Sequence, residues 1–462
     1  MPDIVCISPI DGRELVRRAT ASSEEIEAAL ARARSAQREW AAAPLGARVE
    51  ALLAFLDNLK AMNGEIVPEL AWSMGRPVRY GGEMRGVEER VRHLASIAEE
   101  ALAPVVPEEK AGFRRMIKRE PLGAVLVIAP WNYPYLTAVN GVVPALIAGN
   151  AVILKTAAQT RHTGDRFQAA MDRAGLPGGI FQHLPLSHED VARLLSSGNL
   201  DHVSFTGSVE GGKAIERAAA GSFAGVGLEL GGKDPAYVRA DADLPSAIES
   251  LVDGSFFNSG QCCCGIERIY VDAQVYEPFL EGFIAATRSY VLGNPLDEAT
   301  TLGPMAHARF AALVREHTAE AIAKGAKAHI DPKSFAADKP GTPYLAPQVL
   351  TEVDHTMRVM MEESFGPVVG IMKVSDDDEA VRLMNDSPYG LTASIWTRDD
   401  EAAERLGARI ETGTIYMNRC DYLDPGLAWT GVKNSGRGVS LSEIGYHVLT
   451  QPKSYHLRLG RV

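Results

Sequence analysis

Three adjacent cysteines, Cys262, Cys263 and Cys264, hold most of the thiols of this chain and follow a short polar turn that contains Gly260. Adjacent side chains point in different directions on a strand or a helix, so these thiols cannot share one core pocket. A thiolate is a strong nucleophile, and a glycine turn lets a substrate approach backbone N–H groups. Buried, inert cysteines are the alternative, because free cysteine is among the most buried residue types. Nucleophilic chemistry therefore needs support from a base, an oxyanion donor and an electron acceptor elsewhere in the chain.

A metal site is the second alternative for the three cysteines. Zinc sites usually combine ligands two to four residues apart with a second such pair, and the chain contains no C-x-x-C pair. The cysteine run also has no histidine couple close to it in the sequence. We therefore expect no metal.

Polar residues at the predicted ends of apolar runs supply the missing functions. Asn132 follows the apolar run 124–129, where its amide is placed to donate to an oxyanion. Glu229 lies inside the apolar run 226–230, where a carboxylate is either paired or has a raised pKa that suits a base. Residues 205–208 join a predicted strand to a helix whose N-terminal N–H groups can bind a phosphate. Each signal is weak alone, because turn asparagines are common and the nearby glycines do not form G-x-G-x-x-G.

Composition and charge narrow the range of partners. The net charge of -12 and the pI of about 5.5 argue against nucleic acids and anionic membranes, which bind basic surfaces. No apolar run reaches the roughly 18 residues that span a bilayer, and the N-terminus lacks the basic and apolar regions of a signal peptide. Five cysteines, three of them adjacent, do not form a disulfide framework. We therefore expect a cytoplasmic protein with no membrane and no nucleic-acid partner.

The hydrophobic pattern predicts a helical N-terminal part and two α/β regions. Between residues 120 and 230 apolar runs alternate with helical patterns, which predicts a doubly wound parallel sheet that binds ligands beyond the carboxyl ends of its strands. The same alternation continues after residue 233. The predicted strands are 124–129, 151–155, 180–184, 202–206, 226–230, 266–271, 368–374, 393–397 and 414–418. The predicted helices are 22–42, 51–72, 83–102, 136–148, 160–174, 189–196, 209–220, 245–256, 275–287, 306–324, 378–384 and 402–410. Residues 113–119 are predicted to be extended and 331–343 to form an exposed loop.

Seven motifs in one order connect these features. In this order and with similar spacing they occur in the aldehyde dehydrogenase superfamily, which the chain resembles from end to end. The resemblance implies NAD(P)+-dependent oxidation of a small-molecule aldehyde to its carboxylic acid by the hydrolytic type of mechanism. The motifs are PWN at 130–132, Lys155, FTGS at 205–208, ELGGK at 229–233, GQCCC at 260–264, EESFGP at 362–367 and WTGVKNSG at 429–436.

The resemblance implies a role for each matching residue. Cys263 would be the nucleophile that forms a thiohemiacetal and then a thioester, and Asn132 with the backbone N–H of Cys263 would hold the oxyanion. Glu229 would activate the water that hydrolyses the thioester. The cofactor, NAD or NADP, would contact Trp131, Lys155, Gly207, Ser208, Glu363 and Phe365. The aldehyde would contact Tyr133, Thr137, Asn140, Leu423 and Trp429.

The resemblance also implies the architecture and the assembly. The expected fold is α/β, with two doubly wound α/β domains and a small β element for bridging or oligomerisation. The cofactor-binding domain would comprise 1–102 and 120–229, the catalytic domain 230–436, and the bridging element 103–119 and 437–462. Because the C-terminal extended segment of this family pairs with a neighbouring subunit, a homodimer or homotetramer is expected.

Two residues after Lys155 depart from the family pattern. The family often has proline directly after this lysine and glutamate three positions beyond it, and here these are Thr156 and Ala158. In the family that glutamate binds the adenosine ribose hydroxyls and repels a 2′-phosphate, so Ala158 removes a barrier to NADP. We therefore expect NADP at least to be tolerated, with Arg161 or His162 as a partner of the phosphate.

The substrate mouth departs as well. The usual Phe-Gly-Gly of the last motif is Trp429-Thr430-Gly431 here, which places a bulkier aromatic at the mouth. Arg419 is a candidate contact for an anionic semialdehyde, and a salt bridge from Arg419 to Asp421 or Asp424 is the alternative.

Other functions remain as rivals. A CoA-acylating or semialdehyde-specific dehydrogenase, or a reductase that produces the aldehyde, would use a similar chain, but CoA-acylating relatives usually lack the glutamate that corresponds to Glu229. A non-catalytic binding relative would not need Cys263, Asn132 and Glu229 together.

Overall fold

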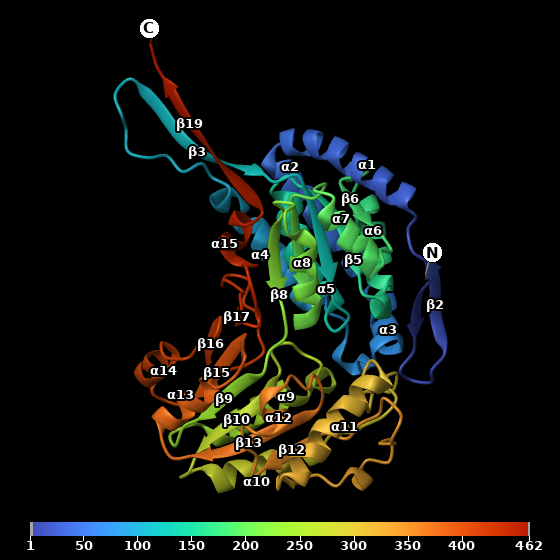
Figure 1. Cartoon of the computed structure of the whole chain (residues 1–462), viewed down its shortest axis with the longest axis vertical. Helices are drawn as coiled ribbons and strands as arrows, with labels where there is room; N and C mark the ends of the chain where they lie inside the picture. The colour runs from blue at the N-terminus through green and yellow to red at the C-terminus, as the bar shows by residue number, and fades with distance from the viewer. Residues whose placement is uncertain (1–2, 461–462) are drawn as a thin grey trace.

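The computed structural model describes residues 3–460 and contains two large, mainly parallel β-sheets with helices packed on both faces of each (Figure 1). The strands of the first sheet are β4 (Ala124–Ala129), β5 (Ala151–Thr156), β6 (Phe181–His183), β7 (His202–Thr206), β8 (Gly225–Glu229) and β18 (Gly436–Arg437). Their order across the sheet is β18-β8-β7-β4-β5-β6, and only β18 pairs antiparallel.

Two hydrophobic cores cover the two faces of the first sheet. Along β4, Val125 and Val127 belong to one core, and Leu126 and Ile128 belong to the other. This alternation follows from the two-residue period of a strand. The helices of this region are α1 (Ser23–Ala42), α2 (Leu45–Ala61), α3 (Asn63–Met74), α4 (Met84–Ala101), α5 (Pro134–Ile147), α6 (His162–Arg173), α7 (His188–Ser196) and α8 (Val209–Ala219), with the 3₁₀ turns η1 (Val78–Tyr80) and η2 (Ala158–Thr160).

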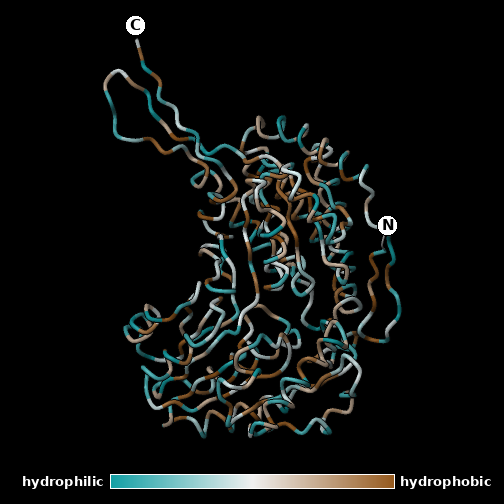
Figure 2. Tube along the Cα trace, viewed as in Figure 1, coloured by the Kyte–Doolittle hydropathy of each residue, from teal (hydrophilic) through white to brown (hydrophobic). Residues whose placement is uncertain are grey.

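The second sheet is built in the same way. Its strands are β9 (Asp234–Val238), β10 (Ile266–Asp272), β11 (Lys327–Ala328), β12 (Gln348–Thr351), β13 (Val368–Val374), β15 (Thr392–Trp396) and β16 (Thr414–Met417). Their order is β11-β12-β13-β10-β9-β15-β16, with only β11 antiparallel to its neighbour. The helices are α9 (Leu244–Phe256), α10 (Tyr276–Arg288), α11 (Ala308–Ala323), α12 (Arg358–Met361), α13 (Asp377–Asn385) and α14 (Asp400–Gly407), with η3 (Phe257–Gly260) and η4 (Pro332–Ser334). The hydropathy colouring places brown, apolar segments inside both sheet regions (Figure 2).

Smaller elements lie outside the two large sheets. A two-stranded antiparallel ribbon of β3 (Phe113–Pro121) and β19 (Thr450–Arg458) projects from the molecule (Figure 1). A hairpin of β1 (Asp3–Ile7) and β2 (Glu14–Ala19) lies along the opposite side. The remaining elements are β14 (Tyr389–Gly390), which pairs with β17 (Val432–Lys433), and α15 (Ser442–His447).

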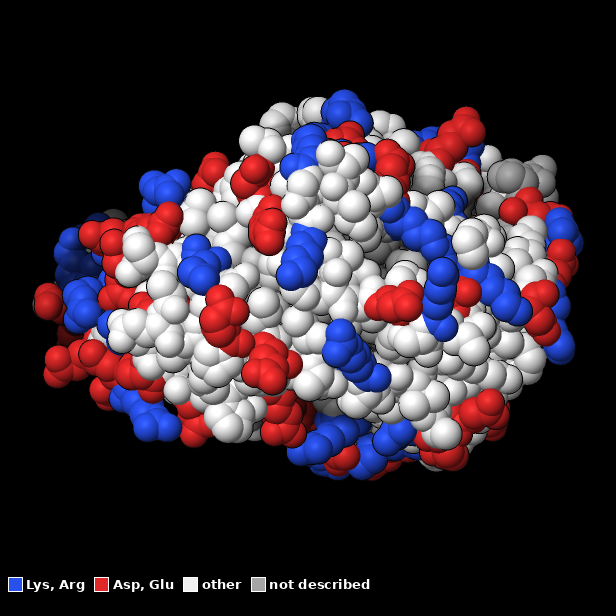
Figure 3. Space-filling view, turned by 90° about the horizontal axis from the view of Figure 1, so that it is seen from below, with Lys and Arg blue, Asp and Glu red and all other residues white. Residues whose placement is uncertain are grey.

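The surface at the second-sheet end carries acidic and basic side chains that are interspersed with one another (Figure 3). Within residues 3–460, no helix is long and apolar enough to cross a membrane, and no group of three or more His, Cys, Asp or Glu side chains is arranged to hold a metal ion.

The predicted α/β fold with parallel sheets is confirmed, whereas several element predictions were wrong. The single helix predicted at 51–72 is two helices that meet at Met62, because Asn63 and Gly64 are poor helix formers and start α3 afresh. The hairpin β1–β2 and strand β9 were not predicted. The segment 331–343 is mostly an exposed loop, as predicted, with the short turn η4 and a buried Phe335 within it.

Candidate active site

A cavity of about 310 Å³ lies beyond the carboxyl ends of β4, β7 and β8. Residues from both sheet regions line it, as expected for ligand sites of parallel sheets. Cys263 faces this cavity, and so does Asn132. The other lining residues include Trp131, Tyr133, Thr137, Thr206, Gly207, Ser208, Gly231, Phe310, Glu363 and Phe365. The structure therefore gathers most of the motif residues around one space.

The cysteine turn owes its shape to three successive left-handed residues. Asn258, Ser259 and Gly260 have φ of 53°, 58° and 70°. A Cβ at Gly260 would lie 2.4 Å from the carbonyl of Gly366, so only glycine fits there. Side chains rarely adopt this conformation, and a run of three such residues is held in place by its surroundings. The turn aims Cys263 at the cavity.

The neighbouring thiols pack behind Cys263. Cys264 is buried, and its Sγ lies 3.5 Å from the Sγ of Cys262. Hydrogen bonds from the two other thiols lower the pKa of Cys262. The hydrogen bond to Cys262, together with burial, raises the pKa of Cys263. This upward shift favours the protonated thiol of Cys263, which must lose its proton to become a nucleophile.

Asn132 is buried beside the cysteine turn. Its side-chain Nδ2 donates to the backbone carbonyl oxygen of Gln261 at 3.3 Å. Its backbone carbonyl oxygen accepts from Asn258 Nδ2 at 3.3 Å. Arg76 Nη2 donates to the same carbonyl oxygen at 2.5 Å. These contacts tie the amide of Asn132 to the segment that carries Cys263.

A buried ion pair anchors this arrangement. Arg76 Nη1 lies 2.8 Å from Glu83 Oε1, and both side chains are almost fully buried. Glu83 Oε2 accepts the backbone N–H groups of Tyr135 at 3.0 Å and Leu136 at 2.7 Å, at the start of α5. Arg76 and Glu83 thus connect the N-terminus of α5 to Asn132 and to the cysteine turn.

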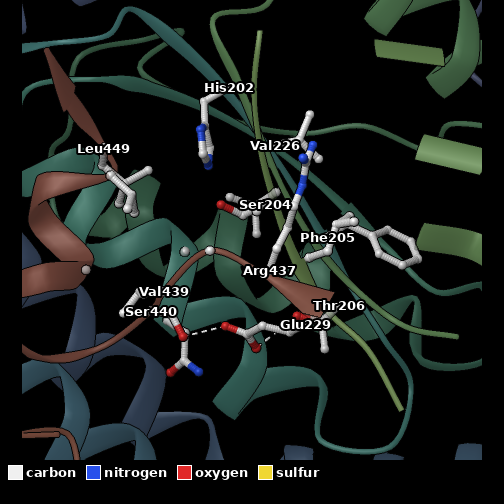
Figure 4. Close-up of a pocket in the computed structure, with 18 of the residues that line it drawn as sticks. His202, Ser204, Phe205, Thr206, Val226, Glu229, Arg437, Val439, Ser440 and Leu449 are labelled. Atoms are coloured by element: carbon white, nitrogen blue, oxygen red, sulfur yellow. Dashed lines mark hydrogen bonds between the residues drawn. The ribbon is translucent and has the colours of Figure 1, made fainter. Parts of the chain in front are cut away.

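Glu229 ends β8 and faces a second, smaller cavity. Its Oε1 accepts a hydrogen bond from Ser440 Oγ, and its Oε2 accepts one from Thr206 Oγ1 at 3.3 Å (Figure 4). Burial raises the pKa of this carboxyl, and the Arg90 guanidinium opposes that rise. Glu229 does not line the cavity that contains Cys263, but Thr137 and Thr206 line both cavities.

The residues expected to hold the nicotinamide half of the cofactor lie together. The rings of Trp131 and Phe310 stack with centroids 5.3 Å apart, and Phe365 meets Trp131 edge-on at 5.6 Å. Glu363 Oε1 accepts the N–H of Gly232 at 3.0 Å, and burial raises the pKa of Glu363 to about 8. A Cβ at Gly231 would lie 2.3 Å from the Glu363 carboxylate, so a bare backbone keeps this space open.

The residues expected to hold the phosphate and adenosine half lie on the first sheet. Ser208 caps the N-terminus of α8, whose free N–H groups attract a phosphate. Burial lowers the pKa of Lys155, and the charge of Lys155 lowers the pKa of His188. A helix N-terminus, an aromatic pair and a carboxylate around one cavity fit the phosphates, the ring and the ribose of a dinucleotide.

The comparisons with known proteins agree with this geometry. The family model described as "Aldehyde dehydrogenase family" matches residues 2–455. The chain belongs to the aldehyde dehydrogenase family. The predicted activity, NAD(P)+-dependent oxidation of an aldehyde to an acid, is the activity of this family and is confirmed at that level.

Individual relatives cover nearly the whole enzyme. The succinate semialdehyde dehydrogenase [NAD(P)+] Sad of Escherichia coli (strain K12) is 32% identical over 446 residues, which are 96% of this chain and 95% of the relative. Vanillin dehydrogenase of Pseudomonas fluorescens is 33% identical over 437 residues, which cover 93% of this chain and 89% of the relative. The solved succinic semialdehyde dehydrogenase of Streptococcus pyogenes, in complex with NADP+, matches with a TM-score of 0.93 at 26% sequence identity. The match covers 98% of this chain and 99% of the Streptococcus pyogenes chain.

The residues predicted to contact the aldehyde lie in three places. Leu423 and Trp429 pack against the cysteine triplet in one apolar cluster. Tyr133 and Thr137 line the cavity of Cys263. Asn140 is buried, accepts a hydrogen bond from Arg90 at 3.0 Å, and lines the smaller cavity behind Glu229.

The structure gives the surroundings of two charged residues that were expected near the ligands. The guanidinium of Arg419 lies 3.5 Å from the ring centroid of Tyr422, and among residues 3–460 it forms no salt bridge to Asp421 or Asp424, which was the alternative to a substrate contact. The Arg161 side chain is buried and pairs with Asp165 at 3.2 Å. Its role towards a 2′-phosphate stays a prediction.

Sequence reasoning missed the residues that position the site. Arg76, Glu83, Arg90, Phe310 and Ser440 lie outside the motif residues that were assigned roles, although Ser440 lies four residues after the last motif. Their contacts join residues up to 211 positions apart in the chain. A pattern of nearby residues cannot reveal such pairs.

We expect Glu83→Ala to destabilise the enzyme, because removing one partner of a buried ion pair costs about 3–5 kcal/mol. The double variant Arg76→Met/Glu83→Leu removes both charges and should recover most of the melting temperature. Its kcat/KM should stay roughly a hundredfold below wild type, as when an oxyanion donor is lost, because Asn132 is no longer fixed. Thermal denaturation and aldehyde oxidation measure the two effects. Wild-type kcat/KM in the folded double variant would contradict the positioning role.

Proposed function

We propose that this aldehyde dehydrogenase works by the hydrolytic route with Cys263 as the nucleophile, Asn132 as an oxyanion donor and Glu229 as the base. One observation carries the proposal: Cys263 and Asn132 share one cavity with the expected cofactor residues, and Glu229 lies just behind its wall. Thr137 and Thr206 line both cavities. A water beside these two residues would contact both Glu229 and a thioester on Cys263.

The first half of the reaction uses Cys263 and Asn132. The deprotonated Sγ of Cys263 forms a bond to the aldehyde carbon, and the carbonyl oxygen becomes an oxyanion. Asn132 Nδ2 and the backbone N–H of Cys263 donate to that oxyanion; the present contact of Nδ2, at 3.3 Å to Gln261, is long enough to be exchanged. Bound NAD(P)+ supplies the acceptor for the hydride that leaves the same carbon.

The second half uses Glu229. A water oxygen attacks the thioester carbon while its proton passes to the Glu229 carboxylate, and the C–S bond then breaks to return the Cys263 thiolate. Burial raises the pKa of Glu229, which brings its basicity closer to neutral pH. The presence of this base favours hydrolysis over transfer of the acyl group to CoA.

We also propose how the cofactor and the aldehyde bind. The aromatic pair of Trp131 and Phe365 would contact the nicotinamide ring, and Glu363 would accept from its ribose. Gly207 and Ser208 would hold the pyrophosphate, and Lys155 would contact the adenosine ribose. The aldehyde would contact Tyr133, Thr137, Asn140, Leu423 and Trp429.

Cys263→Ala is expected to abolish formation of reduced cofactor with every aldehyde tested. Glu229→Gln is expected to keep a first burst of about one equivalent, because hydride transfer precedes hydrolysis, and to lose roughly 10²–10⁴-fold in the steady state. Stopped-flow absorbance of the reduced nicotinamide separates the two phases. Cys264→Ala is the matched control and should retain both phases. Turnover that survives in Cys263→Ala, or steady-state turnover that is unchanged in Glu229→Gln, would contradict the assignment.

NADP+ is expected to be used as well as NAD+, because Ala158 places no carboxylate beside the adenosine ribose. The two kcat/KM values are expected to agree within about tenfold, a difference of roughly 1.4 kcal/mol in transition-state stabilisation. Ala158→Glu should reduce the use of NADP+ selectively. A preference for NAD+ above a hundredfold in the unaltered enzyme would contradict this expectation.

We propose that 1–102 and 120–229 form the cofactor-binding domain, 230–436 the catalytic domain, and 103–119 with 437–462 the element that joins subunits. The ribbon β3–β19 projects away from the two sheets and offers unpaired strand edges, which are templates for pairing with another chain (Figure 1). Light scattering is expected to give at least twice the 49.7 kDa of one chain. A monomer at micromolar concentration would contradict the proposal.

We infer a reducing compartment such as the cytoplasm for this enzyme. All five cysteines are free thiols, including Cys263, which the proposed reaction needs. Cell fractionation tests this inference.

A further inference from the structure

Two paired strands, β7 and β8, form much of the wall of the small cavity behind Glu229. One face of β7 contributes His202, Ser204 and Thr206, and the facing residues of β8 are Gly225, Gly227 and Glu229. The pairs 202–225, 204–227 and 206–229 are in exact register, so the cavity follows the two strands away from Glu229. Its volume is about 90 Å³. Figure 4 shows residues that line it. We call this space the rear chamber.

Polar groups converge on the Glu229 end of the rear chamber. Ser440 Oγ donates to Glu229, and Asn140 lines the wall beside them. A guanidinium can only donate, so the contact from Arg90 fixes Oδ1 of Asn140 as the acceptor. Asn140 Nδ2 is then a buried donor that finds no partner among residues 3–460. Such a donor calls for a water, because an unpaired buried polar group is costly.

The rear chamber has room for several waters and reaches the surface. One water needs roughly 10–15 Å³ of cavity volume, so a cavity of about 90 Å³ holds a short chain of waters. The space exists because Gly227 has no side chain in it. The lining also includes Val448 and Arg437, whose side chains are partly exposed; Arg437 pairs with Leu228, next to Glu229. His202, whose pKa burial lowers to about 4, stays neutral beside this path and can accept and donate hydrogen bonds.

We propose that the rear chamber is the proton outlet of Glu229. This inference rests on the proposed role of Glu229 as the base. Water attacks the thioester carbon, its proton moves to Glu229, and the C–S bond breaks. The Glu229 carboxyl then gives that proton to a chamber water held by Ser440 and Asn140, and the water chain carries it to solvent. The cavity of Cys263 is the less suitable exit, because a bound cofactor and the acyl group would occupy it. Ser440 is a positioning residue that turns the carboxyl towards the outlet.

The test is to fill the rear chamber without touching the residues that react. Gly227→Val places a branched side chain in the chamber, where a Cβ meets only ordinary contacts, the nearest at 3.6 Å to His202. The first burst of reduced cofactor should keep its rate and amplitude. The steady-state rate should fall about tenfold or more, up to the roughly 10²–10⁴-fold that base catalysis contributes. The acyl-enzyme should accumulate in mass spectra, and the solvent deuterium isotope effect should rise.

The controls separate this inference from the proposed function. Gly178→Val, at a site with nothing within 4 Å of an added Cβ, should leave both phases unchanged. If Glu229→Gln loses the steady state while Gly227→Val keeps it, the outlet is overturned and the base remains. If Glu229→Gln keeps the steady state, the base itself is overturned.

A second variant keeps the test decisive if Gly227→Val does not fold. Gly227→Ala/Ser204→Val fills the same space from both strands with smaller groups, and valine suits a strand. Slowing that is confined to the steady state supports the outlet. An unchanged steady state and isotope effect in this folded variant overturn it.

Discussion

The buried ion pair between Arg76 and Glu83 is the interaction on which the active site depends. It joins the end of α3 to the start of α5, and its remaining hydrogen bonds reach Asn132 and Asn258. A charge pair taken out of water gains little stability by itself. Its value here is geometric, because one planar guanidinium holds the oxyanion donor and the cysteine turn in fixed relation.

A second buried pair does the same for the cofactor side. Lys233, in the ELGGK motif, pairs with Glu267 and donates to Ser364 Oγ at 3.1 Å. Glu267 in turn accepts the backbone N–H groups of Ser364 at 2.9 Å and Phe365 at 3.0 Å. The motif lysine therefore positions the loop that presents Glu363 and Phe365. Two internal ion pairs thus fix the two sides of one cavity.

The two cavities divide the chemistry in space. In the proposed mechanism, carbon–sulfur bond formation and hydride loss take place in the cavity of Cys263, which aromatic side chains help to line. The carboxyl of Glu229 is held on the other side of Thr206 by two hydroxyl groups. A base kept apart from the thiol and the oxidised cofactor is available for water once the thioester has formed. Because β7 and β8 pair in register, residues of this one strand pair lie beside both cavities.

The sequence by itself determined the fold class, the family and the identity of the motif residues, because these depend on local patterns and on the order of short motifs. It closely located the strand that ends at Ala129, just before Asn132, and the strands that end at Thr206 and Glu229. The tertiary structure alone decided which way Glu229 turns, that Arg161 is buried, and that Arg76, Glu83 and Ser440 support the site. Those facts depend on contacts between residues far apart in the chain, which no local pattern of side chains encodes.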